Sequence, residues 1–210
     1  MNILKPQKVN ISELTTYSLN DVVESESVNY CIFNNEDCSS INLYENDFEH
    51  CVFNNVCMQN GNLEKITFRD VIFEKCNFSN SEFIESTFIR CEFNNCKISG
   101  CNFADNRLYN VSFLETNACY FNLSMASIEN ILFKNSELRN SYFQETKMKN
   151  VYFSSSDLTQ TQFFKTSLHG IDLSSNKIDG ISISLEDVKG AIIEQQQAID
   201  LLYLIGVKLK

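Results

Sequence analysis

Residues 71–105 read VIFEK CNFSN SEFIE STFIR CEFNN CKISG CNFAD, which is seven consecutive groups of five. The third residue of every group is Phe or Ile, and the first is Val, Cys or Ser. A period of five fits neither an α-helix, whose side chains repeat every 3.6 residues, nor a strand, whose side chains alternate. The pattern predicts a chain that turns a corner every five residues and points one large and one small side chain inward.

The same register extends far beyond this stretch. All 31 residues at every fifth position from Phe33 to Ile183 are apolar, and they include 15 of the 17 Phe; only Phe121 and Phe164 lie elsewhere. A second period of 20 is given by Phe33, Phe53, Phe73, Phe93, Phe113, Phe133 and Phe153. We therefore predict an all-β solenoid, a quadrilateral β-helix over residues 28–193, with these seven Phe as a core ladder. Eight coils at the spacing of strands form a rod of roughly 38 Å.

The N-terminal residues 1–27 are predicted to form an irregular cap coil. Their apolar positions are one residue out of phase with Val28, so the chain slips between Leu19 and Val23; the displaced positions are Val9, Leu14 and Leu19. Glu26 and Glu36 fall at positions for small inward side chains, where an unpaired buried charge is costly.

Residues 194–210 are predicted to form a helix and a short strand that cap the rod. The segment EQQQAIDLLYLI at 194–205 contains good helix formers, Gly206 is a stop signal, and Val207 and Leu209 alternate with lysines. The stripe that covers the last coil is Ala198, Leu201, Leu202 and Ile205, which leaves Tyr203 and Leu204 as surplus apolar surface. That surplus favours a two-fold homodimer. The predicted interface consists of Ala198, Leu201, Leu204 and Ile205.

The charge of the chain is unevenly distributed. The formal net charge of the 210 residues is −10, and the stretch from Val9 to Glu64 has ten acidic residues and no Lys or Arg. Such a negative field repels nucleic acid and membrane surfaces and favours basic partners. Acidic residues can also serve only to keep a protein soluble. No apolar leader and no membrane-length apolar run is present, so we expect a cytoplasmic protein whose nine Cys are reduced thiols.

Four carboxylates fall on one outward edge, at spacings of one or two coils. They are Glu45, Glu85, Asp105 and Glu145, and the same edge also carries Lys65, Met125 and Lys165. A row of this kind could stand in for the phosphates of DNA. An ordinary solvated edge explains it equally well.

Candidate catalytic and metal motifs have simpler explanations. Cys91, Cys96 and Cys101 are spaced by five, but this is the small inward position at three different corners, so we interpret them as free buried thiols. His50 and His169 fall at outward positions. The sequence has no Gly-rich phosphate loop and no GxSxG motif, and a core of Phe leaves no substrate cavity. We expect neither an enzyme nor a cofactor.

Cys-Asn-Phe-Ala-Asp at 101–105 and Cys-Asn-Phe-Ser-Asn at 76–80 resemble the pentapeptide-repeat proteins, whose consensus is A(D/N)LXX. The resemblance implies a right-handed β-helix. The tail is similar to that of the Qnr-type quinolone-resistance proteins, and the matching residues are Gly190, Ile192, Ile193, Gln197, Ala198, Leu201, Leu204 and Gly206.

This subgroup resemblance implies a dimer that mimics duplex DNA, binds a type II topoisomerase (DNA gyrase or topoisomerase IV) and gives quinolone tolerance. No loop interrupts the register between Val28 and Ile193, so the chain is nearer the loop-less members. The alternative is a scaffold that binds an unrelated protein.

Overall fold

The fifth residue of each group makes the corner of the coil. In the computed structural model, which describes residues 3–7 and 10–207, every fifth residue from Ser25 to Gly170 has a positive φ, for example 53° at Asn55 and 69° at Gly100. This left-handed conformation is uncommon outside Gly, and Asn and Asp tolerate it best. The predicted turn at every fifth residue is therefore confirmed, and its physical basis is a repeated left-handed corner.

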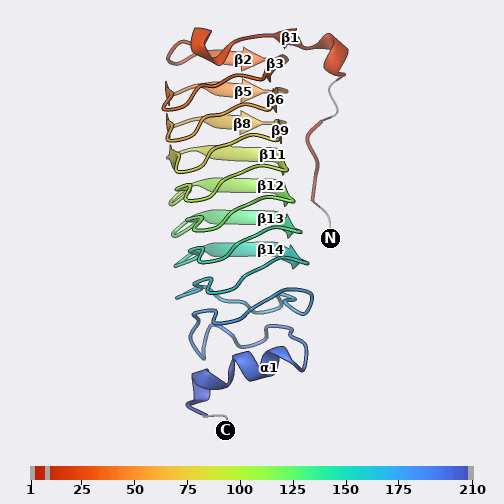
Figure 1. Ribbon diagram of the computed structural model, residues 1–210, viewed down its shortest axis with the longest axis vertical. Coiled ribbons are helices and arrows are strands. Elements are labelled where there is room, and N and C mark those ends of the chain that lie inside the picture. The colour runs from red at the N-terminus through yellow and green to blue at the C-terminus, as the bar shows by residue number, and fades with distance from the viewer. Residues whose placement is uncertain (1–2, 8–9, 208–210) are drawn as a thin grey trace.

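Twenty residues complete one four-sided coil, and the coils stack into a rod (Figure 1). We number the coils from residue 27, so that coil 1 is 27–46, coil 7 is 147–166 and coil 8 is 167–186. The four sides of a coil are faces A, B, C and D in chain order; in coil 2 their central residues are Phe48, Phe53, Met58 and Leu63. The quadrilateral β-helix with a short C-terminal helix is thereby confirmed.

Parallel strands form the faces, and from β2 onward each residue pairs with the one 20 positions away, as in Phe93 with Phe113; β1 pairs with β3 at an offset of 16, as in Thr15 with Cys31. Faces A and B share the larger sheet, face D holds the small sheet β10-β7-β4, and face C is joined by single bridges such as Asp37 with Cys57. The strands are β1 (Thr15–Thr16), β2 (Ser27–Asn29), β3 (Cys31–Asn34), β4 (Asn42–Tyr44), β5 (Asp47–Glu49), β6 (Val52–Asn54), β7 (Asn62–Glu64), β8 (Thr67–Arg69), β9 (Ile72–Glu74), β10 (Glu82–Ile84), β11 (Thr87–Asn94), β12 (Arg107–Leu114), β13 (Ser127–Lys134) and β14 (Lys147–Ser154).

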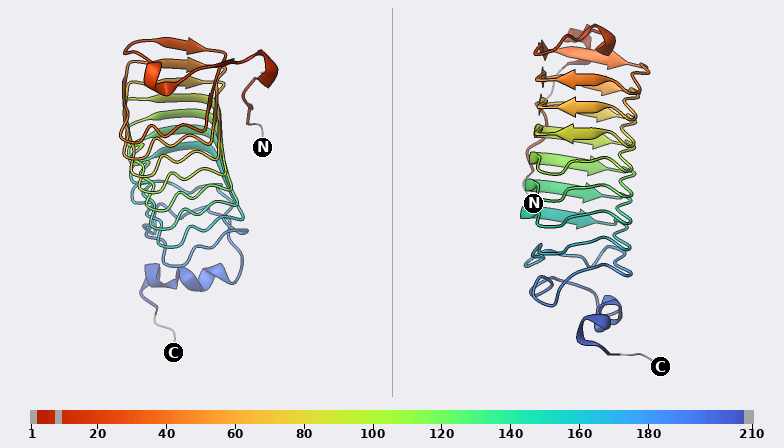
Figure 2. Two further views of the ribbon diagram at one scale, coloured as in Figure 1. Left: turned by 45° about the horizontal axis from the view of Figure 1, so that its top comes forward. Right: turned by 90° about the vertical axis from the view of Figure 1, so that its left-hand side faces the viewer.

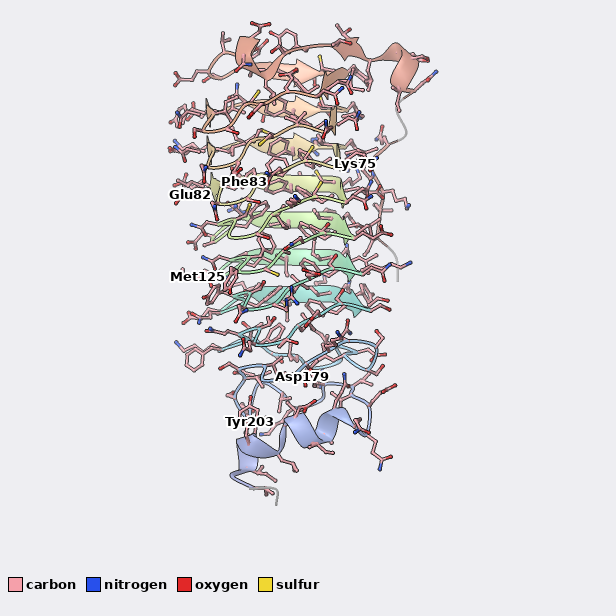
Figure 3. All side chains as sticks on the ribbon, viewed as in Figure 1. Lys75, Glu82, Phe83, Met125, Asp179 and Tyr203 are labelled. Carbon is pink, nitrogen blue, oxygen red and sulfur yellow. The ribbon has the colours of Figure 1, made fainter. Side chains whose placement is uncertain are left out.

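The core is a column of stacked aromatic rings. All seven Phe of the predicted ladder are buried, and the ring of Phe113 lies 4.9 Å from that of Phe93 and 4.8 Å from that of Phe133. Phe83 points into the rod while Glu82 points out of it (Figure 3). Phe121 occupies a small inward position yet is buried, whereas Phe164 is 52% exposed.

The small inward side chains connect successive coils through hydrogen bonds. Thr116 donates its hydroxyl to the carbonyl of Phe93 at 3.1 Å, and Cys101 donates its thiol to the carbonyl of Phe78 at 2.7 Å. In each case the acceptor lies 23 residues earlier, so Ser, Thr and Cys at this position satisfy their polar atoms inside the core.

The N-terminal end caps the rod with η1 (Ile11–Glu13), β1 and η2 (Leu19–Asp21). The expected cost of Glu26 and Glu36 does not arise, because both are only half-buried and both accept hydrogen bonds: Glu36 from the amide of Leu19 at 2.8 Å and Glu26 from the amide of Val23 at 3.0 Å. The side chain of Val23 is 64% exposed, so this residue is not a core position. Val9 lies outside the described residues.

Residues 3–7 do not cap the end of the rod. They run along its side, beside the right-hand edge of the strands in Figure 1, and both turned views place them outside the coils (Figure 2). The amide of Leu4 donates to Asn110 Oδ1 at 3.1 Å, and the amide of Gln7 donates to Asp70 Oδ1 at 3.0 Å. The N-terminal unit predicted as one cap coil thus consists of a cap and a side segment.

The C-terminal helix is shorter than expected. It comprises α1 (Gln197–Asp200) and η3 (Leu202–Ile205), and Gly206 ends it with a φ of 71°, as the stop signal predicted. Leu201 and Leu204 pack against the core. Val207 belongs to no strand, and Leu209 lies outside the described residues.

The prediction of which helix residues cover the last coil is therefore partly wrong. Ala198 and Ile205 are exposed, while Leu204, assigned to the free side, packs against the core. For Leu204 and Ile205 the reason is the change from an α-helix to a 3₁₀-helix after Leu201, which alters the angle between successive side chains. No helix among the described residues is long and apolar enough to cross a membrane.

Candidate partner-binding surface

The predicted acidic edge lies at the corner after face D, and the structure divides its carboxylates into two kinds. Glu45 accepts from the ammonium group of Lys65 at 3.3 Å, and Glu145 accepts from Lys165 at 2.8 Å. Glu85 and Asp105 are exposed and form no ion pair within the described part of the chain. The lysines of the row therefore neutralise two of its four carboxylates.

The electrostatics of Glu45 agree with its pairing to Lys65. A hydrogen bond with Tyr44 and then the ammonium of Lys65 lower the pKa of Glu45. Lys65 also donates to the phenol of Tyr44 at 2.7 Å. This corner is a network of both signs, and among the described residues its free negative charge lies in the middle section, at Glu85 and Asp105.

A second group of free carboxylates lies at the N-terminal end of the rod. Asp21, Glu24 and Asp47 are exposed, and no hydrogen bond or ion pair involves their carboxylates within residues 3–7 and 10–207. Glu24 also lines a shallow groove on face D together with Glu64 and Tyr44. Because no Lys or Arg occurs from Val9 to Glu64, this end of the rod has the most uniform negative charge.

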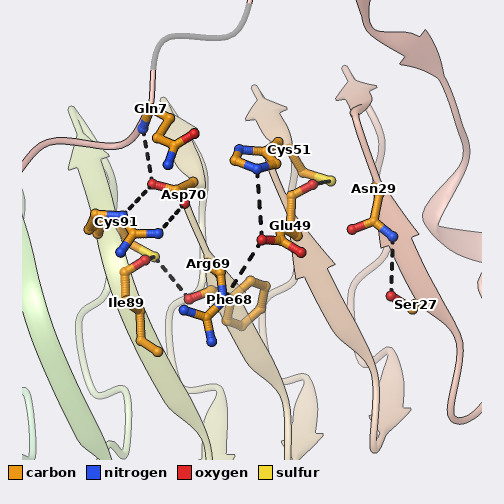
Figure 4. Close-up of polar contacts among 12 residues, drawn as sticks. Gln7, Ser27, Asn29, Glu49, Cys51, Phe68, Arg69, Asp70, Ile89 and Cys91 are labelled. Atoms are coloured by element: carbon orange, nitrogen blue, oxygen red, sulfur yellow. Dashed lines mark hydrogen bonds and ion pairs between the residues drawn. The ribbon is translucent and has the colours of Figure 1, made fainter.

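The corner between faces A and B holds a buried ion pair that the periodicity did not reveal (Figure 4). The carboxylate of Asp70 is fully buried and binds the guanidinium of Arg90 through two hydrogen bonds, one of them 2.7 Å long. The amide of Gln7 adds a third hydrogen bond. Lys5 forms an ion pair with Glu92 at 3.5 Å, so the side segment is attached through charge as well as backbone.

Glu49, His50 and Asp70 approach one another closely enough to suggest a metal site. The geometry favours a different assignment, because Arg90 already occupies both oxygens of Asp70 and His50 stacks on Tyr30 with ring centroids 4.8 Å apart. The group is a structural polar cluster that supports the side segment.

The cysteines are free thiols. Seven are buried, and Cys57 and Cys119 are half-buried. Cys91, Cys96 and Cys101 donate to three different carbonyls, those of Phe68, Phe73 and Phe78. Burial raises the pKa of Cys91 and of Cys101 to about 12, which keeps both thiols protonated at neutral pH.

The C-terminal tail presents an exposed apolar surface. Ile199, Ile205 and Val207 are 49%, 63% and 46% exposed, and Tyr203 is half exposed although its hydroxyl donates to the carbonyl of Ile181. Of the predicted interface, Ala198 and Ile205 belong to this surface, whereas Leu201 and Leu204 pack inward. Ile199 and Val207 are exposed residues that the sequence reasoning did not include.

Comparison with known proteins supports the repeat. A family model for pentapeptide repeats (8 copies) matches residues 62–100, and one for a pentapeptide repeat region matches residues 86–163. Among solved structures, the chain is similar to full-length QnrB1, a plasmid-mediated fluoroquinolone resistance protein, with 18% identity, a TM-score of 0.41 and coverage of 91% of this chain and 95% of that chain.

It is also similar to HetL, a pentapeptide repeat protein involved in heterocyst differentiation regulation from the cyanobacterium Nostoc, with 11% identity, a TM-score of 0.31 and coverage of 80% of this chain and 87% of that chain. No curated protein matches significantly. Structural similarity at this level does not indicate a partner. The five-residue register, the left-handed corners and both family models show that residues 62–163 form a pentapeptide-repeat region.

Proposed function

We propose that this protein is a non-catalytic acidic rod that mimics duplex DNA and occupies the basic DNA-binding surface of a type II topoisomerase, DNA gyrase or topoisomerase IV. The observation that carries the proposal is the acid-only stretch from Val9 to Glu64, whose exposed carboxylates lie on one end of a straight rod. Quinolone tolerance is the expected consequence if the rod competes with DNA on the enzyme.

Several features support binding rather than catalysis. Pentapeptide-repeat proteins are generally non-enzymatic scaffolds. A field of one sign steers a partner of the opposite sign and sets the association rate more than the final affinity. A basic groove made for phosphates is a partner of that kind.

The ion pairs of the rod change which carboxylates we assign to the contact. Glu45 and Glu145 are already paired with lysines, so they contribute little net charge. We assign the contact to Asp21, Glu24 and Asp47 at the N-terminal end, with Glu85 and Asp105 from the predicted row.

Inhibition of gyrase supercoiling by the purified protein tests the proposal. A variant with Asp21→Lys, Glu24→Lys and Asp47→Lys has a net charge of −4, and so has a control with Glu115→Lys, Asp179→Lys and Glu194→Lys. All six residues are exposed, so both variants should fold. We expect the first variant to inhibit about tenfold less than the control, which corresponds to about 1.4 kcal/mol.

Inhibition should also weaken as salt rises, since exposed charges are screened beyond a Debye length of about 10 Å at 0.1 M. An equal loss of gyrase inhibition in both variants would mean that only the total charge of the protein matters. The mimic hypothesis is wrong if the wild type neither inhibits nor competes with DNA for either enzyme at low salt. The second candidate, a scaffold for an unrelated protein, is favoured by the lysines that interrupt the predicted row.

We further propose a homodimer formed through the C-terminal tail. The exposed apolar side chains of Ile199, Ile205 and Val207 lie at the free end of the rod. A two-fold axis there places the same patch against itself and doubles the length of the rod.

A further inference from the structure

Coils 7 and 8 separate on two of the four faces. On faces C and D they are bonded as elsewhere, with Leu158 N to Lys177 O at 2.8 Å and Phe163 N to Ser182 O at 2.7 Å. On faces A and B, within the described part of the chain, no backbone hydrogen bond joins residues 147–154 to residues 167–174. The large sheet accordingly ends at β14 (Figure 1).

Coil 8 pairs on these faces with the turn that follows it. Leu168 N donates to Asp187 O at 2.8 Å, and Gly170 N donates to Gly190 O at 2.9 Å. Residues 167–174 read SLHGIDLS, with a single β-branched residue and no aromatic residue except His. This composition disfavours a strand compared with the KMKNVYFS of β14.

The separation leaves a groove of about 580 Å³. Met148, Val151 and Phe153 of β14 line one wall, and His169 and Ile171 line the other. Met148 is only half-buried, although it occupies the central position of face A that is buried in the coils above. The groove therefore opens onto the edge of the core.

The β14 edge of the groove carries free backbone groups. Met148 and Phe153 occupy the same central position in their groups of five as Leu158 and Phe163. The amides of Leu158 and Phe163 donate hydrogen bonds to carbonyl groups of the next coil. Asn150 is equivalent to Asp70, whose amide donates to Ile89 O at 2.9 Å. The amides of Met148, Asn150 and Phe153 thus face the groove and have no hydrogen-bond acceptor in the next coil within residues 3–7 and 10–207. Unpaired backbone groups in a partly apolar site favour pairing with another strand.

We propose that this groove is a strand-acceptor site for an extended segment of a partner protein that is rich in apolar and acidic residues. A peptide backbone supplies the alternating donors and acceptors that the edge lacks, and apolar side chains suit the wall of Met148, Phe153 and Ile171. Lys134 lines the groove and Lys147 is exposed on β14, and neither forms an ion pair within the described residues, so acidic side chains complement these two positions. Asp172 also lines the groove, but its carboxylate already accepts hydrogen bonds from the amide and hydroxyl of Ser174. The same lysines would repel each other if two copies of β14 met edge to edge.

A designed peptide tests the site in the full chain. The probe is the eight-residue sequence SIEEILFE, which is residues 127–134 of β13 with Asn130→Glu and Lys134→Glu, and the control is a scrambled peptide of the same composition. Fluorescence anisotropy should detect binding of the probe alone. Met148→Ala keeps the amide and removes only the side-chain wall, so it should bind the probe about threefold more weakly than the wild type, whereas Met148→Pro also removes the amide and should bind roughly tenfold more weakly than Met148→Ala.

Hydrogen exchange provides an independent readout that does not depend on folding of the Pro variant. In the free wild type, the amides of Met148, Asn150 and Phe153 should exchange faster than the equivalent amides of coil 6, and the peptide should slow them. The coil 6 amides are those of Ile128, Asn130 and Phe133. Equal protection in the free protein would overturn the proposal, because no edge would then be open. Equal binding of the scrambled peptide, or a dimer abolished by Met148→Pro, would also overturn it.

Discussion

Coil 8 and the coils above it have the same five-residue register, yet they form different structures. The central residues Leu168 and Leu173 of coil 8 are as completely buried as Phe93 in coil 4. Only coils 1–7 form continuous backbone hydrogen-bond ladders on faces A and B. The register is therefore sufficient to bury a side chain, but it is not sufficient to pair the backbone.

The aromatic stack ends where the ladder ends. Phe133 and Phe153 lie 5.3 Å apart, as the last pair of the face B column, and Leu173 follows in coil 8. Stacked rings hold successive coils at a fixed spacing. In this column Leu173 offers no ring to stack on Phe153, and coil 8 pairs with the C-terminal turn instead.

The largest effect is expected from removing one ring of the stack. Phe93 lies between Phe73 at 4.5 Å and Phe113 at 4.9 Å, so Phe93→Ala should cost about 3–5 kcal/mol of the free energy of unfolding. Leu173→Ala in coil 8 should cost about 2–3 kcal/mol, since that side is already open and can collapse. Chemical denaturation measures both, and an equal or larger cost at Leu173 would contradict the comparison.

A smaller effect is expected at the tail that covers coil 8. Leu201→Glu with Leu204→Glu should destabilise the cap by about 1–3 kcal/mol, because both side chains pack against the core. Ile199→Glu with Ile205→Glu should leave thermal stability nearly unchanged and convert a dimer to a monomer. Light scattering and thermal unfolding separate the two outcomes. A wild type that is monomeric at micromolar concentration would remove the dimer from the proposal.

The smallest effect concerns the side segment, which supports the upper coils and has no counterpart at coil 8. Burial raises the pKa of Asp70, hydrogen bonds from Arg90 and Gln7 lower it, and the net shift is downward. A carboxyl group whose pKa is lower in the folded state stabilises the fold above its unfolded value of about 3.9, and this contribution is lost as pH falls through the folded pKa.

Asp70→Asn should therefore reduce the free energy of unfolding at pH 7 and have less effect as the pH falls below about 3.9. Urea denaturation at pH 7 and pH 3 measures the difference. Asp105→Asn, at an exposed carboxylate that forms no ion pair with any described residue, is the control and should have little effect at pH 7. A loss of the same size at both pH values would show that the ion pair with Arg90 does not stabilise the fold.

Most of the fold could be predicted because the repeat is local. Each group of five contributes its own inward pair and its own corner, so reading every fifth residue identified the core from Phe33 to Ile183. The candidate partner-binding surface was less predictable. Glu45 and Lys65 were placed on one edge by the register, but only the structure shows that they are paired.

The sequence by itself determined the coil, the core ladder and the outward direction of the acidic edge, because these follow from periodicity along the chain. The tertiary structure alone decided which carboxylates stay free, where residues 3–7 attach and where the ladder opens. Those features depend on contacts between residues far apart in the sequence, such as Gln7 with Asp70 and Leu168 with Asp187. No local pattern encodes such contacts, since each is chosen by competition between alternative partners in the folded rod.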